Sequence, residues 1–292
     1  MATNLLAALL MRGRNQRNLA RQLVITAPSG VLEQRFATIG EIEQWITISG
    51  EDRANPVLLF VHGGPGSVYS VLSPPLRPWE RFFTIVQWDQ RGAGKTLGRN
   101  GKAGCGAITF DRLVQDGLEL TEYLRGYLGQ EKIILVGSSV GSLTGMMMAK
   151  RRPDLFWAYV GTDQNTGVAS LQRSYELTLA MLRAARNTRG VQAVEMIGAR
   201  LDRLTPKEAR TLHQWTIRAD PSVPDMIDDI FLPGMLSSPD HTLHDVMDIA
   251  NGLAFSNKAL FAEMMSMDLR ALGPRLVAPF FIFQGVRRAD AS

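Results

Sequence analysis

The sequence contains a single cysteine, Cys105, so no disulfide bond can form within one chain. This scarcity fits a reducing compartment, and we expect a cytoplasmic protein. No apolar run reaches the ~18 uncharged residues that a membrane-spanning helix needs, so we expect no membrane partner. Near the N-terminus, the charges follow a short apolar run instead of preceding it, which argues against a signal peptide.

Neither sign of charge dominates, because 32 Lys and Arg residues face 28 Asp and Glu residues, a net charge of +4. The one basic cluster, at residues 12–21, lacks the aromatic partners of a nucleic-acid site. We interpret it as a solvated segment and expect no nucleic-acid partner. The sequence also lacks an H-E-x-x-H motif, a cysteine cluster and a dinucleotide-binding glycine pattern, so we expect no metal and no cofactor.

Short, continuously apolar runs alternate with patterns of helical spacing. Such runs are typical of strands buried on both faces of a parallel sheet, and they occur at residues 56–62, 83–89, 132–137, 157–162 and 279–285. Two earlier runs, FATI and QWITIS, predict an opening hairpin, and residues 110–128 predict a helix. The sequence therefore predicts an α/β fold with a mostly parallel, doubly wound sheet.

The alternation stops at about residue 167, and the next hundred residues favour helices. We interpret residues 167–269 as a helical cap inserted into the fold. The predicted organisation is an N-terminal segment at 1–30, a core at 31–166 and 270–292, and the cap between the two parts of the core.

The segment ILVGSSVGSLTG places Gly137, Ser139 and Gly141 between a predicted strand and a predicted helix. This is the nucleophile-elbow pattern, in which glycines permit a tight turn that exposes a serine hydroxyl. We predict Ser139 as the nucleophile and the N–H of Val140, at the start of the helix, as an oxyanion donor.

A second motif, LLFVHGGPGS, follows another buried strand. An oxyanion hole needs one more backbone N–H, and glycines allow the backbone to approach a substrate carbonyl. We expect Gly64 as the donor, with Gly63 as the next candidate. His62, Pro65 and Gly66 are interpreted as structural members of the same loop.

Together HGGPG, WDQRGAGKT at residues 88–96 and the serine elbow resemble the prolyl iminopeptidase family of α/β-hydrolases over about residues 35–165. The resemblance implies a helical cap and a small peptide or amide substrate with a free N-terminal residue, commonly proline. It also implies structural roles for Asp89 and Arg91. Acidic cap residues would hold the substrate amine, and the candidates stay open among Glu176, Glu195, Asp228 and Asp229.

The sequence departs from the family after its last strand. The triad order in this fold is serine, acid, histidine, but the family's acid position holds Arg288, and Asp290 is only a weak candidate. No histidine follows, because the four in the sequence are His62, His213, His241 and His244. We expect a C-terminal truncation or frame change relative to the family, with residues 279–285 as an exposed sheet edge that promotes self-association.

Two other functions remain open on the same scaffold. One is an esterase or another amidase, because the fold does not determine the substrate. The other is a catalytically inactive ligand-binding protein, because the three histidines at 213, 241 and 244 are interpreted as polar cap residues and not as a base.

Overall fold

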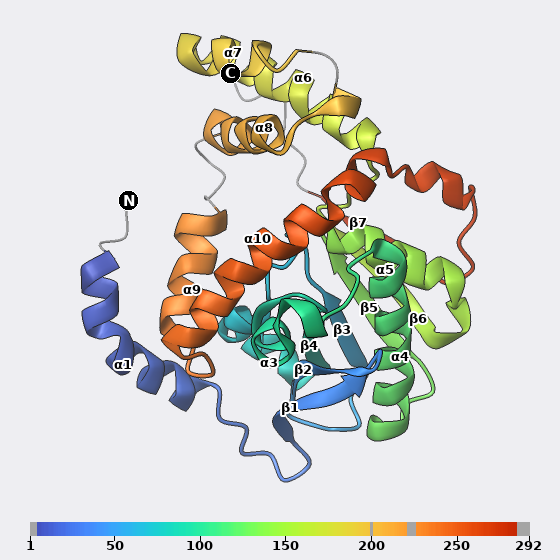
Figure 1. Ribbon diagram of the computed structural model, residues 1–292. Coiled ribbons are helices and arrows are strands. Elements are labelled where there is room, and N and C mark those ends of the chain that lie inside the picture. The colour runs from blue at the N-terminus through green and yellow to red at the C-terminus, as the bar shows by residue number, and fades with distance from the viewer. Residues whose placement is uncertain (1–4, 199–200, 221–225, 285–292) are drawn as a thin grey trace.

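The computed structural model describes residues 5–198, 201–220 and 226–284. A seven-stranded sheet forms its centre, with the strand order β1-β2-β4-β3-β5-β6-β7 (Figure 1). Strand β2 pairs antiparallel with β1 and β4, and every other pairing is parallel. The strands are β1 Val31–Ile39, β2 Ile42–Gly50, β3 Val57–Val61, β4 Thr84–Asp89, β5 Ile133–Ser138, β6 Phe156–Thr162 and β7 Phe280–Phe283. The predicted fold class is confirmed.

The predicted hairpin is formed by β1 and β2, which pair from Val31 with Gly50 to Ile39 with Ile42. Its two-residue loop has positive φ at both positions, 57° at Gly40 and 67° at Glu41. Positive φ at both loop positions gives this turn the same twist as the two antiparallel strands that it connects.

Three helices flank the core sheet: α3 Gly94–Gly104, α4 Phe110–Leu128 and α5 Gly141–Arg151. Helix α4 coincides with the predicted helix at 110–128. It begins where the Thr109 hydroxyl accepts a hydrogen bond from Arg112 N–H at 3.1 Å, and it ends at Gly129 with φ 66°. Its apolar face packs into the main core beside Trp88 and Tyr159.

Between β6 and β7, the described residues form five α-helices, which we call the cap helices: α6 Val168–Ala184, α7 Thr188–Glu195, α8 Pro206–Ala219, α9 Leu232–Ser237 and α10 Leu243–Ser266. Figure 1 shows α10 crossing beside the sheet, with α6, α7 and α8 beyond it. Helices α6, α7 and α8 share an apolar cluster that includes Leu182, Val194 and Leu212. In this region the described chain forms helices and connecting loops without a strand, and an isolated bridge joins Gly167 and Asp268.

The predicted N-terminal segment contains a helix that the sequence patterns did not indicate, α1 Leu5–Gln22. Arg12 donates hydrogen bonds to the carbonyl oxygens of Leu236 at 2.8 Å and of His241. Gln16 donates to the Ser238 carbonyl at 2.8 Å. Cationic donors suit the unpaired carbonyls at a helix C-terminus, so these contacts attach α1 to the end of α9.

The loop after β4 is held by a buried ion pair. Arg91 Nε lies 2.7 Å from Asp116 Oδ2 of α4, and its other nitrogens donate to the carbonyls of Cys105 at 2.6 Å and Gly40 at 2.7 Å. Every charge is therefore met by several partners, as burial of an ion pair requires. The contacts bind α3, α4 and the hairpin turn to one another.

Strand β7 departs from the expectation of burial on both faces. Its side chains, Phe280 to Phe283, are 41% to 64% exposed. The strand pairs with β6 through Tyr159 to Thr162, and no other described strand pairs with it. The apolar run therefore lies at an exposed edge of the sheet, as the sequence predicts.

We expect this edge to promote self-association, because unpaired strand groups and exposed aromatic side chains favour pairing between chains. Sedimentation velocity should show association that increases with protein concentration. Phe281→Lys should reduce the association, since charge on an edge strand opposes pairing between chains. Monomers of both proteins at every concentration would contradict the expectation.

Candidate active site

Ser139 lies between β5 and α5 with φ 51°, a left-handed conformation that is uncommon outside glycine. Its N–H donates to the Thr162 carbonyl at 3.0 Å, and its carbonyl accepts from Ser142 N–H at 3.0 Å. A Cβ at Gly137 would come 2.8 Å from Ser142 Cα. The G-x-S-x-G pattern therefore forms the strand-turn-helix geometry of a nucleophile elbow.

The loop after β3 lies directly against this elbow. A Cβ at Gly63 would be 2.9 Å from Ser139 Cβ and 3.2 Å from Val140 N, whereas one at Gly64 would meet the backbone of Gly66 and Ser67. Gly63 therefore lies directly against Ser139, and Gly64 and Gly63 both stay candidate oxyanion donors. Among the described residues, none accepts a hydrogen bond from Val140 N–H.

His62 is buried in the core of this loop. Its Nδ1 lies 3.0 Å from the Gly63 carbonyl, and its Nε2 accepts from Gln90 N–H at 3.2 Å. Burial lowers the pKa of His62 to about 4, so the ring is neutral near pH 7 and donates through Nδ1. The contact with Gln90 joins the loop after β3 to the loop after β4.

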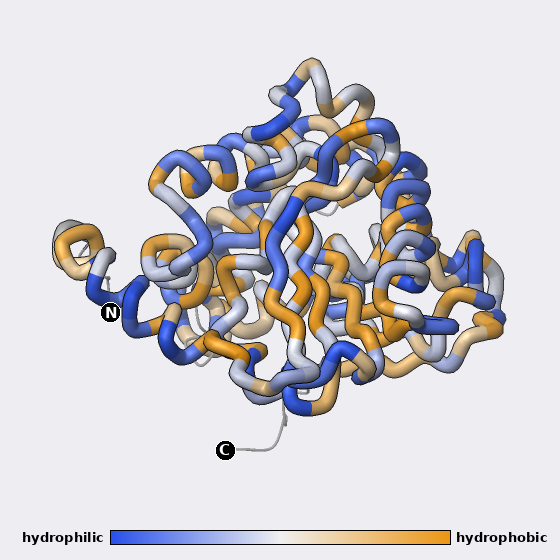
Figure 2. Tube along the Cα trace, turned by 90° about the horizontal axis from the view of Figure 1, so that it is seen from below, coloured by the Kyte–Doolittle hydropathy of each residue, from blue (hydrophilic) through white to orange (hydrophobic). Residues whose placement is uncertain are grey.

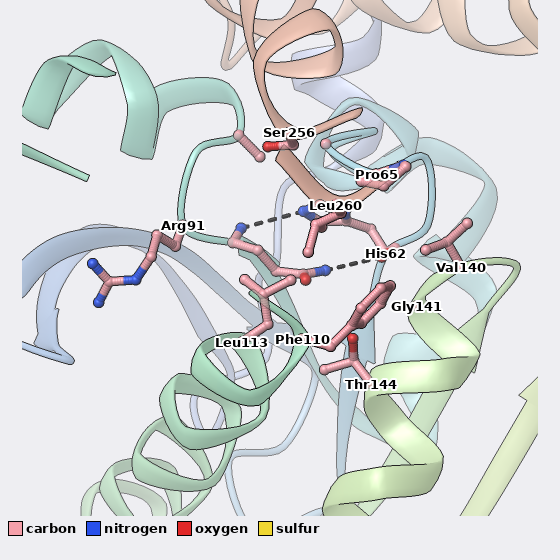
Figure 3. Close-up of a pocket in the computed structure, with 13 residues that line it drawn as sticks. His62, Pro65, Arg91, Phe110, Leu113, Val140, Gly141, Thr144, Ser256 and Leu260 are labelled. Atoms are coloured by element: carbon pink, nitrogen blue, oxygen red, sulfur yellow. Dashed lines mark hydrogen bonds between the residues drawn. The ribbon is translucent and has the colours of Figure 1, made fainter. Parts of the chain in front are cut away.

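A small pocket lies behind the loop and the first turn of α5 (Figure 3). Val140, Gly141 and Thr144 line one side, and Leu260 of α10 lines another. The close-up shows the Arg91 guanidinium directed away from the pocket, in agreement with its ion pair to Asp116. The predicted structural roles of His62 and Arg91 are consistent with these positions.

Two further residues contact the elbow and were missed in the sequence. The Tyr69 hydroxyl donates to Ser138 Oγ at 2.8 Å, and burial raises its pKa, with the nearby Asp163 carboxylate acting in the same direction. Gln164 donates to Ser142 Oγ at 3.1 Å. Neither belongs to a motif of fixed spacing, so only the fold reveals these contacts.

The remaining histidines lie elsewhere, and no imidazole hydrogen-bonds to Ser139 within the described chain. His241 contacts Ser238 Oγ through Nδ1 at 2.8 Å and Ser70 Oγ through Nε2 at 3.2 Å. His244 is 80% exposed beside Asp248, and His213 is exposed on α8. Asp290 and Arg288 lie outside the described residues.

The four candidate amine ligands lie on helices between β6 and β7. Glu176 accepts a hydrogen bond from Gln172 at 2.7 Å, and Glu195 pairs with Arg183 at 2.6 Å, both on exposed helix surfaces. Asp228 and Asp229 lie in a π-helical turn at Met226–Phe231. Among the described residues, no three His, Cys, Asp or Glu side chains gather closely enough to hold a metal ion.

Asp89 belongs to a buried relay that joins the core to the cap helices. Ser70 donates to Asp89 Oδ1 at 3.0 Å, and Lys95 N–H donates to Asp89 Oδ2 at 3.0 Å. Through Ser70 and His241 the relay reaches Ser238, just after α9. Burial raises the pKa of Asp89 to about 7 and lowers that of His241 to about 4.

A mostly parallel sheet in this order, with a serine elbow after β5 and a glycine loop after β3, defines an α/β-hydrolase. The chain belongs to the alpha/beta hydrolase fold family, whose family model matches residues 56–225. No helix in the described parts of the chain is both long enough and apolar enough to cross a membrane.

Two curated relatives share 35% identity with part of the chain. One is the probable aminopeptidase YbaC of Bacillus subtilis, matched over 128 residues, which are 44% of this chain and 40% of that protein. The other is a probable proline iminopeptidase of Streptomyces coelicolor, matched over 133 residues, 42% of this chain and 38% of that protein. The chain thus spans about two fifths of these relatives, and the resemblance that the motifs indicated is confirmed.

Solved structures share the fold at low identity. A proline iminopeptidase of Mycobacterium smegmatis has a TM-score of 0.60 at 15% identity, with 86% of this chain and 80% of that one covered. A 2-hydroxy-6-oxo-6-phenylhexa-2,4-dienoate hydrolase of Rhodococcus has a TM-score of 0.52 at 18% identity, with 88% and 82% covered. These likenesses support the fold alone.

The close approach at the elbow predicts the effect of alanine at Gly141. Its Cβ would overlap the carbonyl oxygens of Val61 and His62, which are backbone atoms that cannot rotate away. We expect Gly141→Ala to lower the free energy of unfolding by about 1–3 kcal/mol. The matched control is Gly126→Ala in α4, where no atom lies within 4 Å of the added Cβ; it should raise stability by about 0.5–1 kcal/mol in the same urea titration. Equal effects would contradict the geometry.

The relay predicts two opposing pH dependences. The folded pKa of Asp89 is above its unfolded value of 3.8, so its contribution to the free energy of unfolding falls as pH rises from about 4 to about 7. The folded pKa of His241 is below its unfolded value of 6.5, so its contribution falls as pH drops from about 6.5 to about 4.

Asp89→Asn lacks the stabilisation that protonation of Asp89 gives the parent, and it keeps the histidine response. Its free energy of unfolding should therefore fall, relative to that of the parent, as pH drops from about 6.5 to about 4. His241→Gln should show the opposite slope, and each change should be on the order of 3 kcal/mol. Urea unfolding at several pH values measures both. Slopes of the same sign would show that the two groups do not titrate as described.

Proposed function

We propose that the protein is a serine hydrolase of the aminopeptidase type, which removes an N-terminal residue, such as proline, from a small peptide or amide. The observation that supports this most strongly is Ser139, held at positive φ against Gly63. The names of the two curated relatives favour the same substrate class. The single cysteine favours a cytoplasmic location.

In the proposed reaction, Ser139 Oγ attacks the substrate carbonyl carbon, and the carbonyl oxygen becomes an oxyanion. The N–H groups of Val140 and of Gly64 or Gly63 would stabilise it, aided by the positive end of the α5 dipole. The proton lost by Ser139 Oγ passes to the leaving amine as the C–N bond breaks, which leaves an acyl-serine. Water then hydrolyses this ester, which releases the N-terminal residue as its carboxylate and restores the Ser139 hydroxyl. The proposal assigns no histidine of the described chain as the base.

The first test compares release of the amine from a prolyl amide by the parent and by Ser139→Ala. We expect the variant to fall to background, because loss of a triad serine can cost about a million-fold in turnover. Ser29→Ala, at an exposed serine far from the elbow, is the control and should match the parent. Equal release with and without Ser139 would reject the mechanism.

Substrate class is tested with the same protein. An N-acylated prolyl amide should be a poor substrate if the free amine is recognised, and a simple ester should be hydrolysed more slowly than the free prolyl amide. Preference for the ester would favour an esterase on this scaffold.

A ligand-binding function without catalysis is the second candidate, because no described imidazole contacts Ser139. Activation of a serine hydroxyl needs a base that can accept its proton. Without one, the oxyanion site and substrate binding leave a rate enhancement of only ~10³ to 10⁴ over the reaction in water. Binding of prolyl amide by calorimetry, unchanged in Ser139→Ala and without turnover, would favour this function.

A further inference from the structure

Helix α1 has one face attached to the protein and the opposite face exposed. Arg12 and Gln16 hydrogen-bond to carbonyls at the end of α9 and in the loop after it, and Leu23, just after the helix, is buried. On the opposite side, residues spaced four, seven and eleven apart fall on one line along a helix. That line consists of Leu10, Arg14, Arg17 and Arg21, all of which are exposed. We call these four residues the arginine ridge.

The positive charge of the ridge is uncompensated. The first acidic residue of the sequence is Glu33, so α1 carries no negative charge. Within the described chain, no carboxylate forms an ion pair with Arg14, Arg17 or Arg21. Exposed arginines such as Arg152 and Arg183 differ in this respect, because each pairs with a neighbouring carboxylate.

Apolar side chains continue the ridge at the outer end of α1. Leu10 is 77% exposed, and Leu9 and Met11 are 40% and 42% exposed. Figure 2 shows the outer turns of α1, beside the N label, as hydrophobic and the following turns as hydrophilic, at the margin of the molecule. Exposed leucines and unpaired arginines are the side chains that interfacial helices present to a bilayer, and in α1 they follow one another along the helix.

We propose that α1 is a docking surface for an anionic lipid bilayer. The three arginines would contact the acidic headgroups, while Leu10 and its exposed neighbours enter the boundary with the acyl chains. This surface would bind a membrane without spanning it, so it revises the expectation of no membrane partner, which depended on spanning segments alone. The proposal is independent of the chemistry at Ser139.

The ridge fits lipid better than nucleic acid. Helix α1 contains no aromatic residue that could stack on a base. Its exposed non-basic end is aliphatic, and aliphatic side chains gain free energy by entering an apolar phase. Both observations point to a partner that has negative charge at its surface and hydrocarbon beneath it.

The test is flotation of the full chain with vesicles of phosphatidylcholine, with and without phosphatidylglycerol. We expect binding to the anionic vesicles only, weakened by salt because the charges are exposed. Arg14→Gln, Arg17→Gln and Arg21→Gln together should lower the partition coefficient about a hundredfold, at roughly fivefold for each arginine. Leu10→Ser should lower it further without changing net charge.

The matched control removes the same charge from the cap helices. Arg173, Arg189 and Arg210 are exposed there, and no described carboxylate pairs with them. Their combined change to glutamine should alter the partition coefficient by less than about threefold, and circular dichroism should show that all variants are folded.

Three results would overturn the proposal. The first is no association of the parent with anionic vesicles. The second is an equal loss in the ridge and control variants, which would mean that net charge alone attracts the protein. The third is a ridge that binds a DNA duplex, or a second copy by sedimentation, while vesicles stay unbound.

Discussion

The arrangement of the site depends on the close approach of two backbone segments, the loop after β3 and the first turn of α5. At Gly63 and Gly141 the two segments leave no room for a side chain. This contact places Gly63 beside Ser139 and Val140 N, and Ser139 itself adopts a positive φ. Without it, the serine turn and the glycine loop would be unrelated features of two neighbouring strands.

Buried polar contacts hold the surroundings of that approach in place. His62 and Gln90 join the loops after β3 and β4 through two hydrogen bonds, and Arg91 joins the second loop to α4. The relay from Asp89 through His241 then connects this loop to the cap helices. Each polar group is paired where water is absent, so these contacts specify one arrangement of the loops over the sheet.

Much of the fold could be predicted from local patterns, because buried strands and amphipathic helices leave periodic signals. The strands from Val57 to Thr162 and helix α4 lie where apolar periodicity indicated them. The elbow at Ser139 was equally readable, since a strand-turn-helix with glycines at fixed spacing is a local requirement. Helix α1 was missed because most of its apolar residues stand in one run at residues 5–11 and are not spaced along one face, and the arginines follow that run.

The sequence by itself determined the strands, the serine turn and the glycine loop, since each depends on residues near one another in the chain. Only the tertiary structure decided that Gly63 lies against Ser139, and that Tyr69 and Gln164 contact the elbow. It also decided that His241 faces Ser70 and that three arginines of α1 form one exposed ridge. These relations depend on how distant segments pack, and no local periodicity encodes that packing.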